Sequence, residues 1–256
     1  MTDLDFARPA EETARPAEET IDDLRAIAEA GAAQLGPDAT ASELLAWTAE
    51  TFGPDFLIAA NMQDAVLIDV ADKAITDKDA VGGKLKALFL DTGYHFAETL
   101  GTRDAVESVY NLELINVTPE QTVEQQDELV GRNLFASDPG ECCRLRKVVP
   151  LKASLAPYRA WVTGIRRVEA PTRANAPLIS FDDAFGLVKI NPLAAWTDEE
   201  FQNYIDANGV LVNPLVDEGY PSIGCEPCTL KPKAGEDPRS GRWAGRAKTE
   251  CGLHAS

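Results

Sequence analysis

The five cysteines of this 256-residue chain form two close pairs and one position near the C-terminus. Cys142 and Cys143 are adjacent, and Cys225 and Cys228 form a C-x-x-C pair in a segment rich in glycine and proline. Four thiolates in two pairs are the right number for a tetrahedral zinc site or an iron-sulfur cluster. The pattern therefore predicts a metal site, and unrelated buried cysteines are the weaker interpretation.

The adjacent pair favours a cluster over zinc. Side chains of neighbouring residues diverge, so directing Cys142 and Cys143 at one ion would strain the backbone, whereas a cubane offers separate irons. We therefore expect a 4Fe-4S cluster held by all four paired cysteines. A redox-active disulfide between Cys225 and Cys228 stays open, but it leaves the other pair unexplained.

The fifth cysteine, Cys251, lies in the terminal sequence KTECGLH at 248–254. A thiol on a short flexible tail can enter a pocket and leave again, which suits a nucleophile that meets two partners in turn. Lys248 and His254 flank it and could favour the thiolate, although a lone histidine is more often a surface residue than a base. An incidental terminal thiol is the alternative interpretation.

Net charge and hydropathy exclude several classes of function. The formal charge of −18 argues against a nucleic-acid partner, because phosphate binding needs a basic surface. The N-terminal sequence has no apolar signal region, and no apolar run approaches the length that crosses a bilayer. We therefore expect a cytoplasmic protein without a membrane partner.

The charge is unevenly distributed along the chain. Between Arg144 and Lys248 there are 15 Lys and Arg against 12 Asp and Glu, and elsewhere 9 against 30. One part of an acidic protein is thus comparatively cationic, although any single one of these side chains is best interpreted as a solvated surface residue.

Short apolar segments alternate with amphipathic ones along most of the chain. Strands are expected at 56–60, 87–93, 112–117, 160–165 and 186–190, and helices at 21–35, 41–52, 65–74, 97–110, 120–130, 141–156 and after Thr197. Capping boxes at Thr40 with Glu43 and at Thr197 with Glu200 mark two helix starts. This alternation predicts an α/β fold with a parallel-type central sheet and helices on both faces.

Three turns follow expected strands at the edge where such sheets bind ligands, namely 59–64, 91–99 and 164–173. The repeated heptad ARPAEET at 7–20 is too polar to order itself. We therefore expect a disordered acidic tail at 1–22, an α/β domain with the cysteine site at 23–230, and a mobile C-terminal tail carrying the nucleophile at 231–256.

Six motifs in order give the chain a family resemblance. They are LDTGYHFAET (90–99), CCRLRKV (142–148), GIRRVEAPTR (164–173), GCEPC (224–228), PRSGRW (238–243) and KTECGLH (248–254). Together they resemble the assimilatory adenylylsulfate (APS) reductases, most closely the actinobacterial members, from about residue 40 to the C-terminus. The resemblance implies a PAPS reductase-like fold of the adenine-nucleotide alpha-hydrolase type.

The resemblance also assigns roles to single residues. It implies a 4Fe-4S cluster on the two cysteine pairs and a nucleophilic Cys251. It implies that the phosphosulfate is bound by Lys147, Arg166, Arg173, Arg239 and Arg242, with Arg167 close by. The first loop, Ala60 to Asp64, departs from the Gly- and Ser-rich loop of related nucleotide-binding proteins, so its ligand contacts stay open.

The implied reaction reduces APS to sulfite and AMP through an S-sulfocysteine, in sulfate assimilation and cysteine biosynthesis. Thioredoxin or a similar dithiol is the implied reductant, and self-association into a homo-oligomer stays open.

A PAPS reductase is the nearest alternative, but typically lacks the cysteine pairs. A tRNA thiolase would need an S-G-G-x-D-S loop, which residues 59–65 do not contain. An aspartic protease with Asp91 as its catalytic residue fits the alternation of strands and helices poorly. A zinc-stapled interaction module would be colourless and bind one zinc.

Overall fold

The computed structural model describes residues 19–246, 248 and 250–253. Residues 1–18, which include all of the ARPAEET repeat except Glu19 and Thr20 and most of the expected acidic tail, lie outside the described residues, as does His254. The first described helix, α1 (Ile21–Leu35), begins at a capping box of Thr20 and Asp23. The second, α2 (Ala41–Phe52), begins at the predicted box of Thr40 and Glu43.

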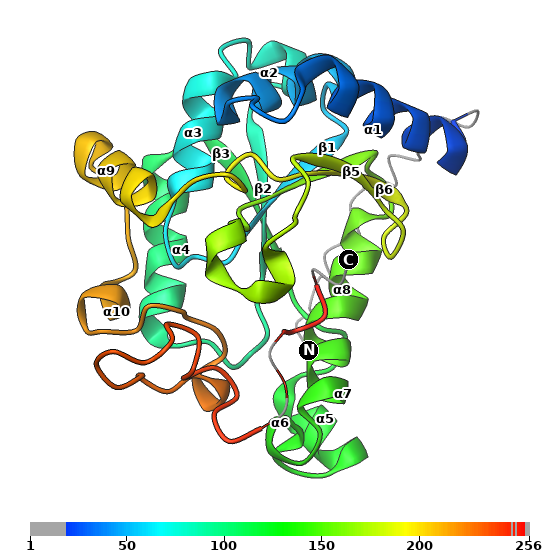
Figure 1. The fold of residues 1–256 in the computed structure, drawn as a ribbon. Helices are drawn as coiled ribbons and strands as arrows, with labels where there is room; N and C mark the ends of the chain where they lie inside the picture. Colours follow the sequence, from blue (N-terminus) through cyan, green and yellow to red (C-terminus); the bar gives the residue numbers. More distant parts are fainter. Residues whose placement is uncertain (1–18, 247, 249, 254–256) are drawn as a thin grey trace, which may run out of the picture.

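The described strands form one sheet (Figure 1). They are β1 (Phe56–Ala60), β2 (Leu85–Leu90), β3 (Leu112–Val117), β4 (Ala160–Thr163), β5 (Ile179–Asp182) and β6 (Leu187–Ile190). Their order is β3-β2-β1-β4-β6-β5, and every pair is parallel except β5 with β6. The predicted parallel sheet is confirmed, and the antiparallel edge strand β5 is an addition to it.

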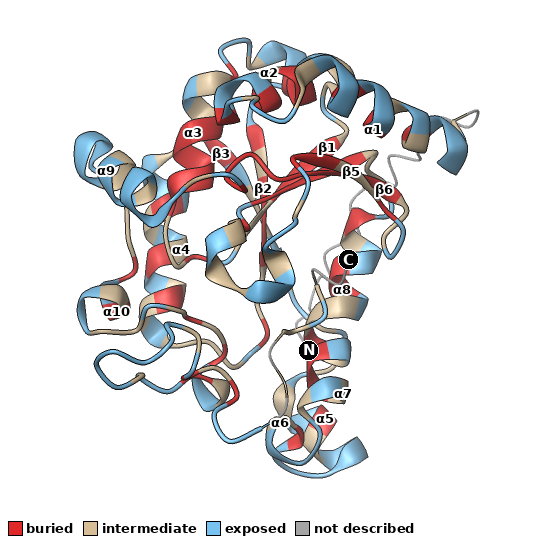
Figure 2. Cartoon of the chain, in the orientation of Figure 1, coloured by how far each residue is buried: buried red, intermediate tan, exposed pale blue. Residues whose placement is uncertain are grey.

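Alternation along the strands divides the core into two layers. In β1, Ile58 packs with α1, α2 and α3 (Val66–Ala74) on one face, whereas Leu57 faces the other. In β4, Val162 belongs to the first layer and Trp161 to the second, which α8 (Val149–Leu155) covers. Because neighbouring side chains point to opposite faces, strands that are buried on both faces need helices on both sides. Figure 2 shows the strands of the sheet largely in the colour of buried residues.

The remaining helices lie mostly around the site. They are α4 (Ala97–Val109), α5 (Val123–Val130), α6 (Leu134–Ser137), α7 (Pro139–Cys143), α9 (Asp198–Asn208) and α10 (Pro214–Asp217). Helix α9 begins at the predicted capping box of Thr197 and Glu200 and ends at Gly209, which has a left-handed conformation. No described helix is both long and apolar enough to cross a bilayer.

The helix expected at 141–156 is interrupted. A π-helical segment, Arg144–Val148, separates α7 from α8. Pro150 lies just beyond it, and a proline ring lacks an N–H and crowds the carbonyl four residues earlier. A wider helical turn relieves that conflict, and such turns are frequent at functional sites. This turn carries Lys147.

Candidate active site

A cavity of about 680 Å³ opens at the carboxyl ends of β1, β2 and β4. It is lined by the three turns identified in the sequence, through residues such as Gln63, Thr92 and Arg166. Strand β1 pairs with β2 on one side and β4 on the other, so the connections leave it in opposite directions. Ligands of open α/β sheets bind at such a switch point.

Six of the residues that the sequence singled out meet in this cavity. They come from the π-helical turn, the loop after β4 and the C-terminal segment, which is the part of the chain after α10 from Glu218 onward, and they are Lys147, Arg166, Arg173, Arg239, Arg242 and Cys251. The predicted cations and the predicted nucleophile thus line the same cavity, although more than one hundred positions separate Lys147 from Cys251 in the sequence. With Arg167, six lysine and arginine side chains line the cavity, and they face five carboxylates of the same lining, those of Asp64, Glu169, Asp198, Asp237 and Glu250.

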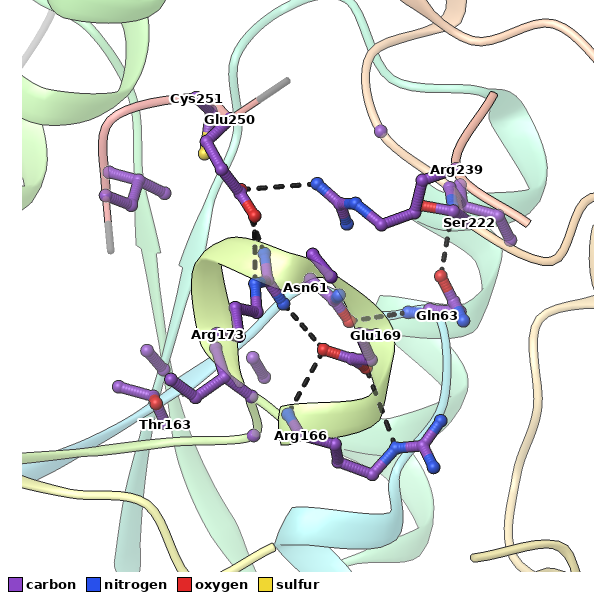
Figure 3. Close-up of a pocket in the computed structure, with 18 of the residues that line it drawn as sticks. Asn61, Gln63, Thr163, Arg166, Glu169, Arg173, Ser222, Arg239, Glu250 and Cys251 are labelled. Carbon is purple, nitrogen blue, oxygen red and sulfur yellow. Dashed lines mark hydrogen bonds and ion pairs between the residues drawn. The ribbon is translucent and has the colours of Figure 1, made fainter. Parts of the chain in front are cut away.

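Two of these arginines bind a carboxylate of the C-terminal segment (Figure 3). Arg173 Nε and Nη2 each donate to Glu250 at 3.0 Å, and Arg239 Nη2 donates to it at 3.2 Å. The Thr172 hydroxyl donates a further hydrogen bond of 3.2 Å. Burial acts to raise the pKa of Glu250, but these arginines outweigh it and lower the pKa overall.

Arg166 and Arg242 are held by other partners. Arg166 donates to Asp198 at 2.8 Å and its guanidinium lies 4.2 Å from the Phe201 ring centre. Arg242 donates to Ser222 Oγ at 3.2 Å, and its buried Nε has no hydrogen-bond partner among the described residues. Burial, the largest effect, lowers the pKa of Arg242. An unpaired buried N–H in a cation of this kind is a ready donor to an anionic ligand.

The first loop contributes two residues that sequence reasoning did not assign. Gln63 donates to the Pro221 carbonyl at 3.2 Å and accepts from the Ile223 amide at 2.9 Å, which ties this loop to the segment preceding Cys225. Desolvation raises the pKa of Asp64 to about 6. Met62, directly before Gln63, has a positive φ of 60°, a strained conformation that is common at ligand sites.

The four paired cysteines line a second, small cavity next to the first. Cys142, Cys143 and Cys225 are buried, and Cys228 is half-buried. None of the five cysteines, all within the described residues, forms a disulfide. No three His, Cys, Asp or Glu side chains of the described chain converge closely enough to bind one metal ion. All four paired cysteines nevertheless line the same small cavity.

The walls of this small cavity carry polar groups without partners. Tyr94 OH and Trp243 Nε1 are buried and have no hydrogen-bond partner among the described residues. The Thr92 hydroxyl lies 3.3 Å from Cys225 Sγ. Lys147 and Arg242 line both cavities, so the two sites share cationic walls.

Cys251 lies between two attachments of the terminal segment. Glu250, the residue before it, is hydrogen-bonded to Arg173, and Leu253, two residues after it, packs with the second core layer. Gly252 between them has a φ of 86°, which only glycine adopts readily. Burial acts to lower the pKa of Lys147, but the Cys225 and Cys251 sulfurs outweigh burial and raise it overall. Lys147 is thus electrostatically coupled to both kinds of cysteine.

Comparison with known proteins gives consistent matches. The phosphoadenosine phosphosulfate reductase domain matches residues 54–231. The chain is 71% identical to adenosine 5'-phosphosulfate reductase of Mycobacteroides abscessus, covering 92% of this chain and 96% of that one. It is 70% identical to the protein of the same name from Mycolicibacterium smegmatis, covering 93% and 97%. A solved structure of phosphoadenylyl-sulfate (PAPS) reductase from Candida auris, a phosphate complex, matches with a TM-score of 0.64 and 26% identity, covering 84% and 98%.

Proposed function

This chain belongs to the phosphoadenosine phosphosulfate reductase family, and we propose that it reduces adenylylsulfate to sulfite and AMP in assimilatory sulfate reduction. Both bacterial relatives compared above bear the name of an adenosine 5'-phosphosulfate reductase. The single observation that carries the chemistry is the position of Cys251 in the wall of a cavity that six lysine and arginine side chains also line.

In the first step, the Cys251 thiolate attacks the sulfur of APS. An S–S bond forms, the bond from that sulfur to the bridging oxygen breaks, and AMP leaves with the electron pair. APS is negatively charged where a thiolate must approach, so the bare encounter is repulsive. Lys147 and the arginines offset this repulsion and stabilise the charge that develops on the leaving phosphate.

In the second step, a dithiol such as thioredoxin resolves the S-sulfocysteine. Its thiolate attacks Cys251 Sγ, and sulfite leaves with the electron pair of the S–S bond. The second thiol of the dithiol then breaks the mixed disulfide and restores Cys251. The dithiol supplies both electrons. Cys251 lies on a short terminal segment, which suits a thiol that must contact APS first and the dithiol afterwards.

We also propose that Cys142, Cys143, Cys225 and Cys228 hold a 4Fe-4S cluster. Support comes from the four cysteines that line one small cavity, and from the buried Tyr94 and Trp243 donors in its wall, which have no hydrogen-bond partner among the described residues. Buried polar groups are almost always paired, and thiolate or sulfide acceptors would satisfy these two. When bound, the cluster would supply an electrostatic environment for Lys147 and Arg242, because the thiols already provide the electrons.

The decisive experiment uses Cys251→Ser. We expect this variant to keep its iron content while intact-mass spectrometry with APS detects no sulfo adduct, whereas the wild type gains one. An adduct that persists on the variant would refute the assignment of the nucleophile. Parallel turnover of APS and PAPS by the wild type tests the substrate, and a preference for PAPS would contradict the proposal.

A further inference from the structure

Glu250, directly before the nucleophile, lies on the arginines that the proposed substrate needs. Its two carboxylate oxygens receive hydrogen bonds from Arg173 and Arg239 (Figure 3), and one of them also receives a hydrogen bond from the Thr172 hydroxyl. In the figure, the carboxylate points from the terminal segment into the cavity toward both guanidinium groups. A carboxylate between two arginines resembles a phosphate or sulfate group, because it is also an anion and its oxygens also accept paired hydrogen bonds from guanidinium groups.

The contacts leave little of Arg173 for another anion. Glu250 occupies the edge formed by Nε and Nη2, and Nη1 donates to Glu169 at 2.6 Å. All three guanidinium nitrogens therefore face carboxylates. The Arg173 side chain is only 11% exposed, so an incoming anion cannot simply approach it from the solvent. Glu250 and a phosphosulfate thus exclude each other at this edge.

We propose that Glu250 is an internal anion that occupies the phosphosulfate position in the resting protein and that the substrate must displace. This proposal rests on the proposed function for the identity of the displacing anion. The exchange is feasible because it replaces one anion by another. The buried arginines stay paired in both states, whereas losing Glu250 without a replacement would leave buried charge uncompensated.

Displacement would not detach the terminal segment. Leu253 packs with the second core layer, where Leu151, Leu155 and Trp161 are almost fully buried. Gly252 separates this apolar attachment from Cys251 and supplies a flexible pivot. When Glu250 leaves the arginines, the Leu253 attachment keeps the Cys251 thiol at the cavity. Substrate binding is thereby linked to a change in the position of the nucleophile.

The test measures APS binding without turnover, in a Cys251→Ser background, by calorimetry. Adding Glu250→Gln should tighten APS binding by about tenfold, because a neutral amide competes more weakly for the arginines and the binding-competent fraction rises. Glu250→Asp, which keeps the charge, should leave the affinity closer to that of the parent. Glu218→Gln is the matched control, since this exposed carboxylate makes no hydrogen bond or ion pair in the described chain.

A second readout separates competition from a structural role. With Cys251 present, Glu250→Gln should lower KM for APS and raise the rate at which iodoacetamide alkylates Cys251, read by peptide mass spectrometry. An unchanged or weaker APS affinity in Glu250→Gln would overturn the proposal. A failure of the proposed function would look different, because APS would then not bind the Cys251→Ser parent at all.

Discussion

Asp64 carries a carboxyl group that the cavity partly removes from water. Desolvation raises its pKa to about 6, the nearby Glu169 acts in the same direction, and Arg166 and the Val66 amide oppose them. Since this value lies above the ordinary 3.9 or so of an unfolded chain, the folded state binds the proton more tightly. The protonated carboxyl of Asp64 therefore favours the folded state only at low pH. The free energy of unfolding falls as the pH rises from about 4 to about 6, and this effect of Asp64 does not change further above that range.

Asp64→Asn should remove this penalty. The amide can still accept the Val66 hydrogen bond, so we expect the variant to be more stable than the wild type by about 1 to 3 kcal/mol at pH 7. The difference should shrink toward zero near pH 4, measured by urea unfolding at several pH values. The exposed Asp38→Asn provides a control with changes below about 0.5 kcal/mol. A gain at pH 7 that does not shrink on acidification would contradict the argument.

Residue types were easier to predict than residue partners. The motifs named five cations and one thiol that the structure brings to one cavity. They did not name the carboxylates that pair with those cations, such as Glu250, which is 77 positions from Arg173. The sequence did contain one signal, an acidic residue directly before the nucleophile. Pairing across that distance depends on the path of the chain, which no local pattern contains.

At the scale of elements, the contact between α1 and α2 depends on a glycine. A Cβ at Gly31 would lie 2.2 Å from Trp47 Cζ2, and the buried indole ring cannot rotate away easily. Gly31→Ala should therefore destabilise the protein by about 1 to 3 kcal/mol, since overpacking outweighs the gain in helix propensity. The midpoint of urea unfolding measures this change.

Gly101 in α4 gives the matched comparison. It is exposed, and a Cβ there would meet nothing within 4 Å. Gly101→Ala should stabilise the protein by up to about 1 kcal/mol, because only the helix propensity changes. The same substitution is thus expected to have opposite signs at the two positions. Stabilisation by Gly31→Ala would show that the two helices do not pack as described.

Elements with strong local signals were predicted, and those set by tertiary context were not. The strands of the parallel core and the capping boxes at Thr40 and Thr197 follow from hydrophobic runs and cap chemistry. Strand β5, with the sequence Ile-Ser-Phe-Asp, lies at the sheet edge beside β6 and alternates apolar with polar residues, so it lacks the apolar run by which the equally short β4 and β6 were predicted. The π-helical turn at 144–148 was missed because periodicity alone does not distinguish it from an α-helix.

On the scale of the whole molecule, the small cysteine cavity joins segments that are far apart in the sequence. The turn after β2, helix α7 and the C-terminal segment all contribute to its walls. The C-terminal segment, orange to red in Figure 1, runs from α10 toward α6. Hydrogen bonds that link it to the rest of the fold include Glu226 N to the Tyr94 carbonyl at 2.7 Å and Arg246 Nη1 to the Phe135 carbonyl at 2.6 Å. A group bound to all four sulfurs would cross-link these segments.

Removal of the proposed cluster should therefore loosen the C-terminal segment while the sheet stays folded. After anaerobic purification and chelation of the iron, trypsin should cut faster after Lys233 and Arg246, because binding energy that favours the closed arrangement is lost. Cleavage after the exposed Lys84, in the loop before β2, should keep its rate and serves as the internal reference. Peptide mass spectrometry against time gives both rates in one digest.

Two outcomes of this digest have distinct meanings. Faster cleavage at all three sites would indicate that the whole fold depends on the iron, so the group would stabilise more than its own cavity. Equal rates before and after chelation at Lys233 and Arg246 would contradict the cross-link, because the buried sulfurs would then hold their places without a bound group. Burial raises the pKa of Cys142 to about 12, so an iron-free cavity would keep that thiol protonated at neutral pH. Such a cavity lacks the strong bonds that four thiolates make to iron, and the segment that Cys225 and Cys228 anchor should open first.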